Sequence, residues 1–92
     1  MHFTTNGTPQ NSRRLNRIFG DNVAYFRLRQ GKTQQVLAGL SGVGRRCVLQ
    51  VENAEVNARM DIVEKIAAGL DVEPYRLFMD SSQAEGRSHR AI

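Results

Sequence analysis

The first regular pattern of apolar residues along the chain lies within residues 13–30. Apolar residues recur there at steps of three and four positions, as they do on one face of an α-helix: Leu15, Ile18, Phe19, Val23 and Phe26. Gly31 stands where this helix would end, and glycine readily adopts the left-handed conformation of a C-terminal cap. Gly20 interrupts the stripe and is expected to loosen the first turns. The pattern predicts one long amphipathic helix.

Two short helices are predicted in the middle of the chain. Thr33 is a suitable N-cap for a helix over 34–40, because its hydroxyl can accept a hydrogen bond from an unpaired backbone N–H. The pattern breaks at residues 41–43, and a second short helix is predicted over 44–52. The polar residues 53–57 that follow are predicted to form a loop.

The remaining apolar residues predict two further helices. A fourth amphipathic stripe comprises Met60, Val63, Ile66, Ala67 and Leu70. Pro74 suits the first position of a last short helix, where its missing N–H costs nothing. No segment alternates apolar and polar residues with a period of two, so no strand is expected. The predicted fold class is therefore all-α, with five helices.

The two ends of the chain lack such patterns. Residues 1–12 are polar and contain glycine and proline, so we interpret them as a flexible N-terminal arm, and residues 80–92 as a disordered tail. The globular domain then spans residues 13–79. The full chain has 92 residues, enough for one hydrophobic core. It has neither an apolar run of the ~20 residues that a membrane span requires nor a secretory signal, so a cytoplasmic location without a membrane partner is expected.

The charge of the chain is distributed unevenly. Residues 1–51 contain eight of the thirteen basic residues and only one acidic residue, Asp21, whereas residues 52–92 are rich in acidic residues. Eleven of the thirteen basic residues are arginine, whose planar guanidinium suits phosphates and guanine edges. A basic half indicates a surface for a polyanion, with nucleic acid favoured over a membrane surface and a merely solvated surface as the plain alternative.

The sequence offers no arrangement for catalysis or for a metal. Cys47 is the only cysteine, and with the distant His2 and His89 it cannot form a zinc site. No nucleophile lies in a pattern with a base and an orienting group. We expect neither enzymatic activity nor a cofactor.

Residues 34–53 meet the spacing requirements of a helix-turn-helix motif. Two short helices that cross closely need a small residue at the contact, here Ala38, and a tight turn that tolerates positive φ, here Gly42. Val43, Val48 and Val51 are placed to attach the second helix to the core.

A helical wheel for this second helix separates two faces. At about 100° per residue, Val48 and Val51 fall on one side near the direction of Gly44. The opposite side carries Arg45, Arg46, Leu49 and Gln50. Arginine and glutamine are common side chains for bidentate contacts with guanine and adenine in the major groove, so this face is a candidate for base recognition.

With these motifs, the chain resembles the Cro/lambda-repressor-like helix-turn-helix proteins, also called the XRE type. The resemblance extends from Phe19 to Phe78 and rests on FRLRQGKTQQVLA, GVGRR followed by VLQVEN, and MDIVEKIAAGLDVEPYRLF. It implies a five-helix DNA-binding domain that usually binds an operator in double-stranded DNA as a two-fold dimer.

The resemblance also implies roles for individual residues. Gln34 matches a glutamine that contacts a phosphate and supports the base-reading side chains, and Asn53 lies where the family's loop meets the DNA backbone. Arg27 and Glu52 match an ion pair that connects the first helix to the end of the third. The DNA-binding residues implied in this way are Gln34, Gly44, Arg45, Arg46, Leu49, Gln50 and Asn53.

The chain departs from the family pattern at four positions. Val36 replaces a usual acidic residue, and Ser41 stands where an apolar residue is common, so a slight rotation of the second helix is expected. Ala54 replaces a glycine that often opens the loop, and Ala58 replaces a proline that often precedes the fourth helix. These differences concern local geometry and leave the fold class unchanged.

Three further sets of residues are assigned expected roles. Arg13, Arg14 and Arg17 lie next to the N-terminal arm and are candidates for contacts with flanking phosphates. Because a core of this size is marginal alone and two recognition helices give better specificity, we expect a homodimer. The candidate contact residues are Leu70, Val72, Tyr75 and Phe78. Cys47 is interpreted as a small filler, with a redox switch as the alternative if the neighbouring arginines lower its pKa.

The hypothesis favoured by the sequence is a sequence-specific transcriptional regulator of the phage-repressor, restriction-modification-controller or plasmid-regulator kind, acting as a dimer on a palindromic operator. The alternative is an antitoxin whose main role is binding a toxin protein. Only the two ends of the chain would be available for such a partner, and neither is strongly apolar. RNA binding is disfavoured, because the surface aromatic residues that single-strand readers use are missing from the pattern.

Overall fold

The structure, a computed structural model, describes residues 8–80 of the chain, with side chains from Arg13 onward. It contains four α-helices and one 3-10 helix: α1 (Thr8–Arg29), α2 (Gln34–Ser41), α3 (Arg45–Glu52), α4 (Met60–Leu70) and η2 (Pro74–Phe78). The all-α fold class is confirmed for this part of the chain, which includes no strand. The last predicted helix is instead a 3-10 helix of five residues, a geometry that is common in such short pieces.

Helix α1 begins at Thr8, five residues earlier than its apolar pattern predicts. Residues 8–12 lack the apolar periodicity that marks a helix packed on a core, and Pro9 is tolerated because it lies in the first turn. The prediction of a flexible arm over residues 1–12 is therefore wrong for residues 8–12. Residues 1–7 and the predicted tail over 81–92 lie outside the described residues.

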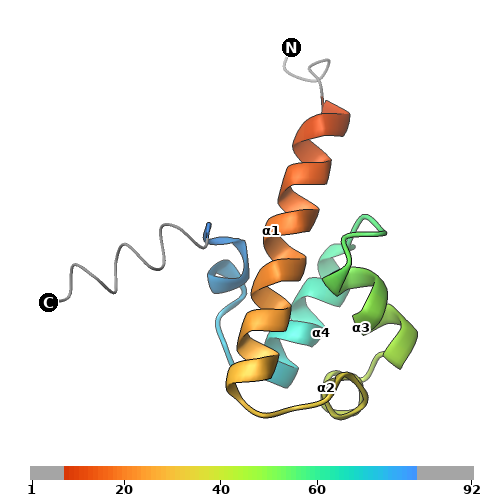
Figure 1. The fold of residues 1–92 in the computed structure, drawn as a ribbon, viewed down its shortest axis with the longest axis vertical. Coiled ribbons are helices and arrows are strands. Elements are labelled where there is room, and N and C mark those ends of the chain that lie inside the picture. Colours follow the sequence, from red (N-terminus) through yellow and green to blue (C-terminus); the bar gives the residue numbers. More distant parts are fainter. Residues whose placement is uncertain (1–7, 81–92) are drawn as a thin grey trace, which may run out of the picture.

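The elements are arranged around α1. Figure 1 shows α3 and η2 on opposite sides of this helix, with α2 near its C-terminal end and the first turns of α1 extending beyond the other helices. The most extensive packing joins α2 to α4, α1 to α3, α1 to η2, and α2 to α3. Among the described helices, none combines the length and apolar character needed to cross a membrane.

One hydrophobic core receives side chains from every element. Phe19 stacks on the ring of Phe78, with centroids 5.2 Å apart, and so attaches η2 to α1. Most of the residues that the sequence pattern assigned to apolar stripes are buried here, and each of the five helices contributes at least one buried apolar side chain. The buried apolar residues are Phe19, Val23, Leu37, Ala38, Val48, Val51, Val63, Ile66, Ala67, Leu70 and Leu77.

The predicted helix ends are found at three positions. The Thr33 hydroxyl accepts a hydrogen bond from the Val36 backbone N–H at 3.0 Å, so Thr33 is the N-cap of α2. Gly42 caps the other end of α2 with φ of 75°, and Gly31 follows α1 with φ of 68°. Both glycines adopt the left-handed conformation that the sequence analysis assigned to them.

A buried asparagine fixes the C-terminal part of the fold. The Asn22 Nδ2 atom donates to the carbonyl oxygens of Leu77, at 2.9 Å, and Met79, at 2.7 Å. These two bonds satisfy carbonyl groups that a short 3-10 helix leaves unpaired. Together with the stacking of Phe78, they hold η2 and the residue after it against α1.

Candidate nucleic-acid interface

Helices α2 and α3 form a compact pair joined by a three-residue turn. Ala38 is 2 % exposed, as expected of the small residue at the helix contact. Its carbonyl oxygen accepts backbone N–H bonds from Gly42, at 2.9 Å, and Val43, at 3.1 Å, which close the turn. The predicted roles of Ala38 and Gly42 in the helix-turn-helix geometry are confirmed.

The two faces of α3 are those given by the helical wheel. Val48 is fully buried and Val51 is 2 % exposed, so this side of the helix is attached to the core. Arg45 and Arg46 are exposed, whereas Gln50 is partly buried. Leu49, also partly buried, shares the outer face, and Gly44 and Asn53 are exposed at its two ends. The candidate base-reading residues thus lie on the side of α3 opposite Val48 and Val51.

The first turn of α3 combines two sources of positive potential. Gly44 is the N-cap and provides no side-chain hydrogen bond to the first backbone N–H groups of α3, which have no partner within the helix. The positive end of the helix dipole lies at the same position as the guanidinium groups of Arg45 and Arg46. An anion or an electronegative base edge is favoured at this end of α3.

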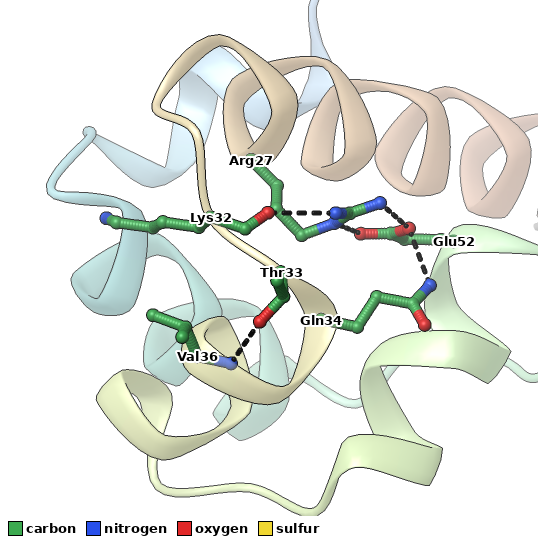
Figure 2. A network of polar contacts seen from close by, with 6 residues as sticks. All are labelled: Arg27, Lys32, Thr33, Gln34, Val36 and Glu52. Carbon is green, nitrogen blue, oxygen red and sulfur yellow. Dashed lines mark hydrogen bonds and ion pairs between the residues drawn. The ribbon is translucent and has the colours of Figure 1, made fainter.

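A network around Glu52 connects three helices, as Figure 2 shows. The Glu52 carboxylate accepts two hydrogen bonds from Arg27 of α1, from Nε at 2.7 Å and from Nη2 at 3.0 Å. Arg27 Nη1 also donates to the backbone carbonyl of Lys32 at 2.9 Å. The predicted ion pair between the first helix and the end of the third is therefore present. The arginine and glutamate side chains are only 13 % and 7 % exposed.

The ion pair is also reflected in the protonation of Arg27. The hydrogen bonds from Arg27 to Glu52 raise the pKa of the guanidinium above its ordinary value, against the opposing effect of burial. Arg27 therefore stays charged wherever the protein is folded. A bidentate pair of this kind fixes direction as well as distance, so it sets the orientation of the C-terminal end of α3 relative to α1.

Gln34, the first residue of α2, takes part in this network. Its Nε2 atom donates to Glu52 Oε1 at 3.0 Å, and the side chain is partly buried. A glutamine amide carries two hydrogens, so one remains available beside the N-terminus of α2. Gln34 thus supports the end of α3, and its expected phosphate contact stays a prediction.

The loop between α3 and α4 is attached to α1 by Asn16, a residue that the sequence analysis did not select. Asn16 Oδ1 accepts the backbone N–H of Ala58 at 3.0 Å, and Asn16 Nδ2 donates to Asn57 Oδ1 at 2.7 Å. The loop opens at Ala54 with φ of 55°, the left-handed conformation that explains why glycine is frequent at this position in the family. No local sequence pattern identifies a contact between residues this far apart.

The three N-terminal arginines lie on the exposed surface of α1. Arg14 approaches Asp80 at 3.9 Å, and Arg17 approaches Asp21 at 3.8 Å. These are long contacts between exposed side chains, which contribute little and leave the cations available to other anions. Arg13 is exposed as well. Their expected role at flanking phosphates stays a prediction.

The four candidate dimer residues differ in accessibility. Leu70 is 0 % exposed and packs within the core, so its prediction as a contact residue is wrong. An apolar residue on a helix is compatible both with a core and with an interface. Leu70 packs in the core of its own protomer. Phe78 is partly buried against Phe19, Val72 is partly buried, and Tyr75 is 67 % exposed.

Cys47 lies partly buried on α3. Burial raises the pKa of its thiol, and the negative charge of Asp61 raises it further, while Lys65 lowers it. This direction is opposite to the one that the redox-switch alternative needs. Among residues 8–80, no group of three metal-binding side chains comes together.

Comparison with known proteins gives one family. A family model described as helix-turn-helix matches residues 23–77. Among curated proteins, the chain is 34 % identical over 65 residues to a Neisseria hypothetical transcription factor from Neisseria meningitidis serogroup B. This match covers 71 % of the chain but 61 % of the relative, so the chain spans about three fifths of that protein's length.

The solved structures that are similar to this one include two restriction-modification controllers and a hypothetical transcription factor. The restriction-modification controller protein C.AhdI from Aeromonas hydrophila has a TM-score of 0.66 and 36 % identity, covering 68 % of this chain and 96 % of its own. The hypothetical transcription factor NHTF from Neisseria has a TM-score of 0.74 and 30 % identity, covering 78 % and 83 %. A mutant of the restriction-modification controller protein C.Esp1396I has a TM-score of 0.64 and 28 % identity, covering 70 % and 83 %.

Proposed function

The chain belongs to the helix-turn-helix family, of the Cro/lambda-repressor-like type, and on this premise we propose that it regulates transcription as a homodimer bound to an operator in double-stranded DNA. It acts by occupying a defined site near a promoter. It is a DNA-binding protein rather than an enzyme. Two of the similar structures are restriction-modification controllers, which favours a controller of this kind.

The observation that carries the proposal is the exposed first turn of α3. Arg45 and Arg46 project from a helix whose other side is fixed by Val48 and Val51. A recognition helix needs this combination, because side chains discriminate between bases only when the helix that carries them has a defined orientation. The bidentate pair of Arg27 and Glu52 supplies a second constraint at the other end of the same helix.

In the proposed complex, Arg45, Arg46 and Gln50 contact base edges in the major groove. Gln34 and the backbone N–H groups at the start of α2 contact a phosphate, and Asn53 contacts the backbone on the other side. The exposed arginines Arg13, Arg14 and Arg17 supply contacts to flanking phosphates. Each phosphate contact by a cation adds ~0.9 to the dependence of log K on log[salt].

We propose a dimer because the recognition helix of one protomer contacts only a short stretch of DNA. Helix α3 has eight residues, a length of ~12 Å, and reads only a few base pairs. Two copies related by a two-fold axis read half-sites ~34 Å apart and so gain specificity. Tyr75, Val72 and Phe78 are the candidate contact residues that keep exposed surface in the protomer.

The test is selection of bound duplexes from a random pool, followed by sedimentation of the protein alone and with the most enriched duplex. We expect a palindromic consensus and a complex that contains two protomers. A protein that enriches no sequence above the starting pool would refute the proposed function. Sedimentation as a monomer, both free and bound, would refute the dimer.

A further inference from the structure

We infer that Asn16 is a positioning residue for DNA binding, which sets the loop after the recognition helix for contact with a phosphate through Asn57. The inference rests on the proposed function and adds a residue of α1 to it. Asn16 itself is partly buried, and Asn57 is exposed. Their side chains are linked by a 2.7 Å hydrogen bond across 41 residues of sequence.

The orientation of both amide groups follows from hydrogen-bond chemistry. The backbone N–H of Ala58 can only donate, so the Asn16 atom that faces it is the acceptor Oδ1. Asn16 Nδ2 must then donate to its other partner, and Asn57 receives this bond through Oδ1. The remaining polar atom of Asn57, Nδ2, is a donor that is not used in this pair. A donor without an intramolecular role on an exposed side chain suits a phosphate oxygen.

The position of the loop in the fold places this donor next to the recognition surface. The loop starts at Asn53, directly after the eight residues of α3. A recognition helix lies in the major groove, so segments joined to its end approach the phosphates that border the groove. The start of α2 contacts the last residue of α3 through Gln34 and therefore flanks the C-terminal end of α3. The Asn57 loop leaves the same end of α3.

The loop between α3 and α4 also needs a contact from outside the loop to stay in a single conformation. At its start, Ala54 adopts a left-handed conformation that is unfavourable for a residue with a Cβ atom. Backbone bonds from Ala54 to Val51, at 3.0 Å, and from Glu55 to Gln50, at 2.9 Å, hold only the first part. Asn16 holds the last part. Removing it allows residues 56–58 to relax without disturbing the core.

The test uses four variants and two probes. Asn16→Ala removes the attachment, Asn57→Ala removes the donor, and Asn57→Asp keeps an acceptor for Asn16 but replaces the donor with a negative oxygen. Gln30→Ala is the matched control, because it removes a similar 2.8 Å bond, from the residue after α1 to the carbonyl of Leu70 at the end of α4, together with the contact from Lys32 Nζ to Gln30 Oε1. The probes are the most enriched duplex of the selection and a mixed-sequence duplex of the same length. Binding is measured well below each variant's melting temperature.

We expect Asn16→Ala and Asn57→Ala each to weaken binding about 3- to 10-fold per protomer on both probes. The double variant should bind no more weakly than either single variant, and Asn57→Asp should bind most weakly. The salt dependence of binding by Asn16→Ala and Asn57→Ala should not change, because neither substitution alters a charge. Gln30→Ala should lower the melting temperature without lowering affinity.

Three results overturn the inference. If Asn16→Ala lowers the melting temperature but binds both duplexes like the unchanged protein, Asn16 is only a structural residue. If the losses of Asn16→Ala and Asn57→Ala add in the double variant, Asn16 does not act through Asn57. If the unchanged protein enriches no duplex, the proposed function fails, and the inference fails with it.

Discussion

Gly20 of α1 lies directly against the backbone of Val51 in α3. A Cβ atom at Gly20 would overlap the carbonyl oxygen of Val51 and would stand 3.2 Å from that of Glu52. Gly20 was expected to loosen the first turns of the helix, yet α1 is continuous through this position. Gly20 instead permits the close approach that places α3 beside α1.

We therefore expect Gly20→Ala to destabilise the protein by ~1–3 kcal/mol, because the added methyl group forces the backbones of two helices apart. Alanine's better helix propensity offsets part of this effect. The measurement is urea denaturation. Gly39→Ala is the matched control: Gly39 lies in α2 with open space around its Cβ position, so this change should stabilise by ~0.5–1 kcal/mol. Equal effects of the two substitutions would contradict the close approach.

Ser41, which stands where the family usually has an apolar residue, should lower the stability of the protein. Its side chain is buried, and Oγ has no hydrogen-bond partner among the described residues. Ser41→Ala removes a buried, unpaired hydroxyl and should stabilise the protein by ~1 kcal/mol. Thr33→Ala removes a hydroxyl from the other end of α2, where it caps the helix, and should destabilise by ~1 kcal/mol. Thermal melting of both variants tests the opposite signs; a loss of stability in Ser41→Ala would show that the hydroxyl is satisfied in solution.

The pair of Arg27 and Glu52 should behave as one unit. Arg27→Ala leaves the Glu52 carboxylate buried without its charged partner, and we expect a loss of ~3–5 kcal/mol. The double variant Arg27→Ala/Glu52→Ala should lose clearly less than the sum of the single variants, since no unpaired charge remains. Denaturant titration of the four proteins gives the coupling energy. Additive losses would mean that the two side chains act independently.

The recognition surface makes a prediction about specificity. Arg46→Ala or Gln50→Ala should cost ~1–3 kcal/mol on the selected operator and relax the preference at one base position in each half-site. Binding to mixed-sequence DNA should change little, because its phosphate contacts are kept. Gln34→Ala should weaken binding to all sequences more evenly. The measurement is binding of each variant to a set of single-base operator variants. An unchanged base profile in both Arg46→Ala and Gln50→Ala, with the fold intact, would show that another face of α3 reads the DNA.

Cys47 should be an unreactive thiol in the folded protein. Its pKa is raised by burial and by Asp61, so less thiolate is present at a given pH than in a free thiol. Alkylation by iodoacetamide at neutral pH should accordingly be slower than alkylation of glutathione. Faster alkylation than glutathione would revive the redox-switch alternative.

The same shift has a consequence for stability, whose sign follows from linkage. The folded protein holds the thiol proton more tightly than the unfolded chain does. The stability that this protonated thiol contributes is fully present below the pKa of the unfolded thiol, ~8.5. It is lost as the pH rises through the pKa of the thiol in the folded protein. The protein should therefore lose more stability on alkaline titration than Cys47→Ala does.

Local patterns were sufficient for most of the helices and for the division of α3 into a buried and an outer face. The spacing of Val48 and Val51 correctly oriented α3, and Thr33, Gly31 and Gly42 marked helix ends through their own backbone and hydroxyl chemistry. These features depend on neighbours within a few positions, and the sequence contains that information directly.

Contacts between distant segments could not be found in the same way. Asn16, Asn22 and Gly20 act on residues more than thirty positions away, and nothing adjacent to them in the sequence indicates these partners. The start of α1 at Thr8 was missed because its first turns extend beyond the core and carry no apolar stripe. Leu70 was assigned to an interface because its apolar character does not distinguish the two kinds of burial.

The attachment of η2 to α1 sets the order in which the core can be completed during synthesis. Asn22 and Leu77 are 55 residues apart, so their hydrogen bond closes one of the widest loops in the fold. Helices α2 and α3, in contrast, are joined by three residues and can pair as soon as both exist. Until Phe78 has emerged from the ribosome, the ring of Phe19 lacks its stacking partner. A nascent chain therefore exposes part of the apolar face of α1 after its helix-turn-helix unit has already been made.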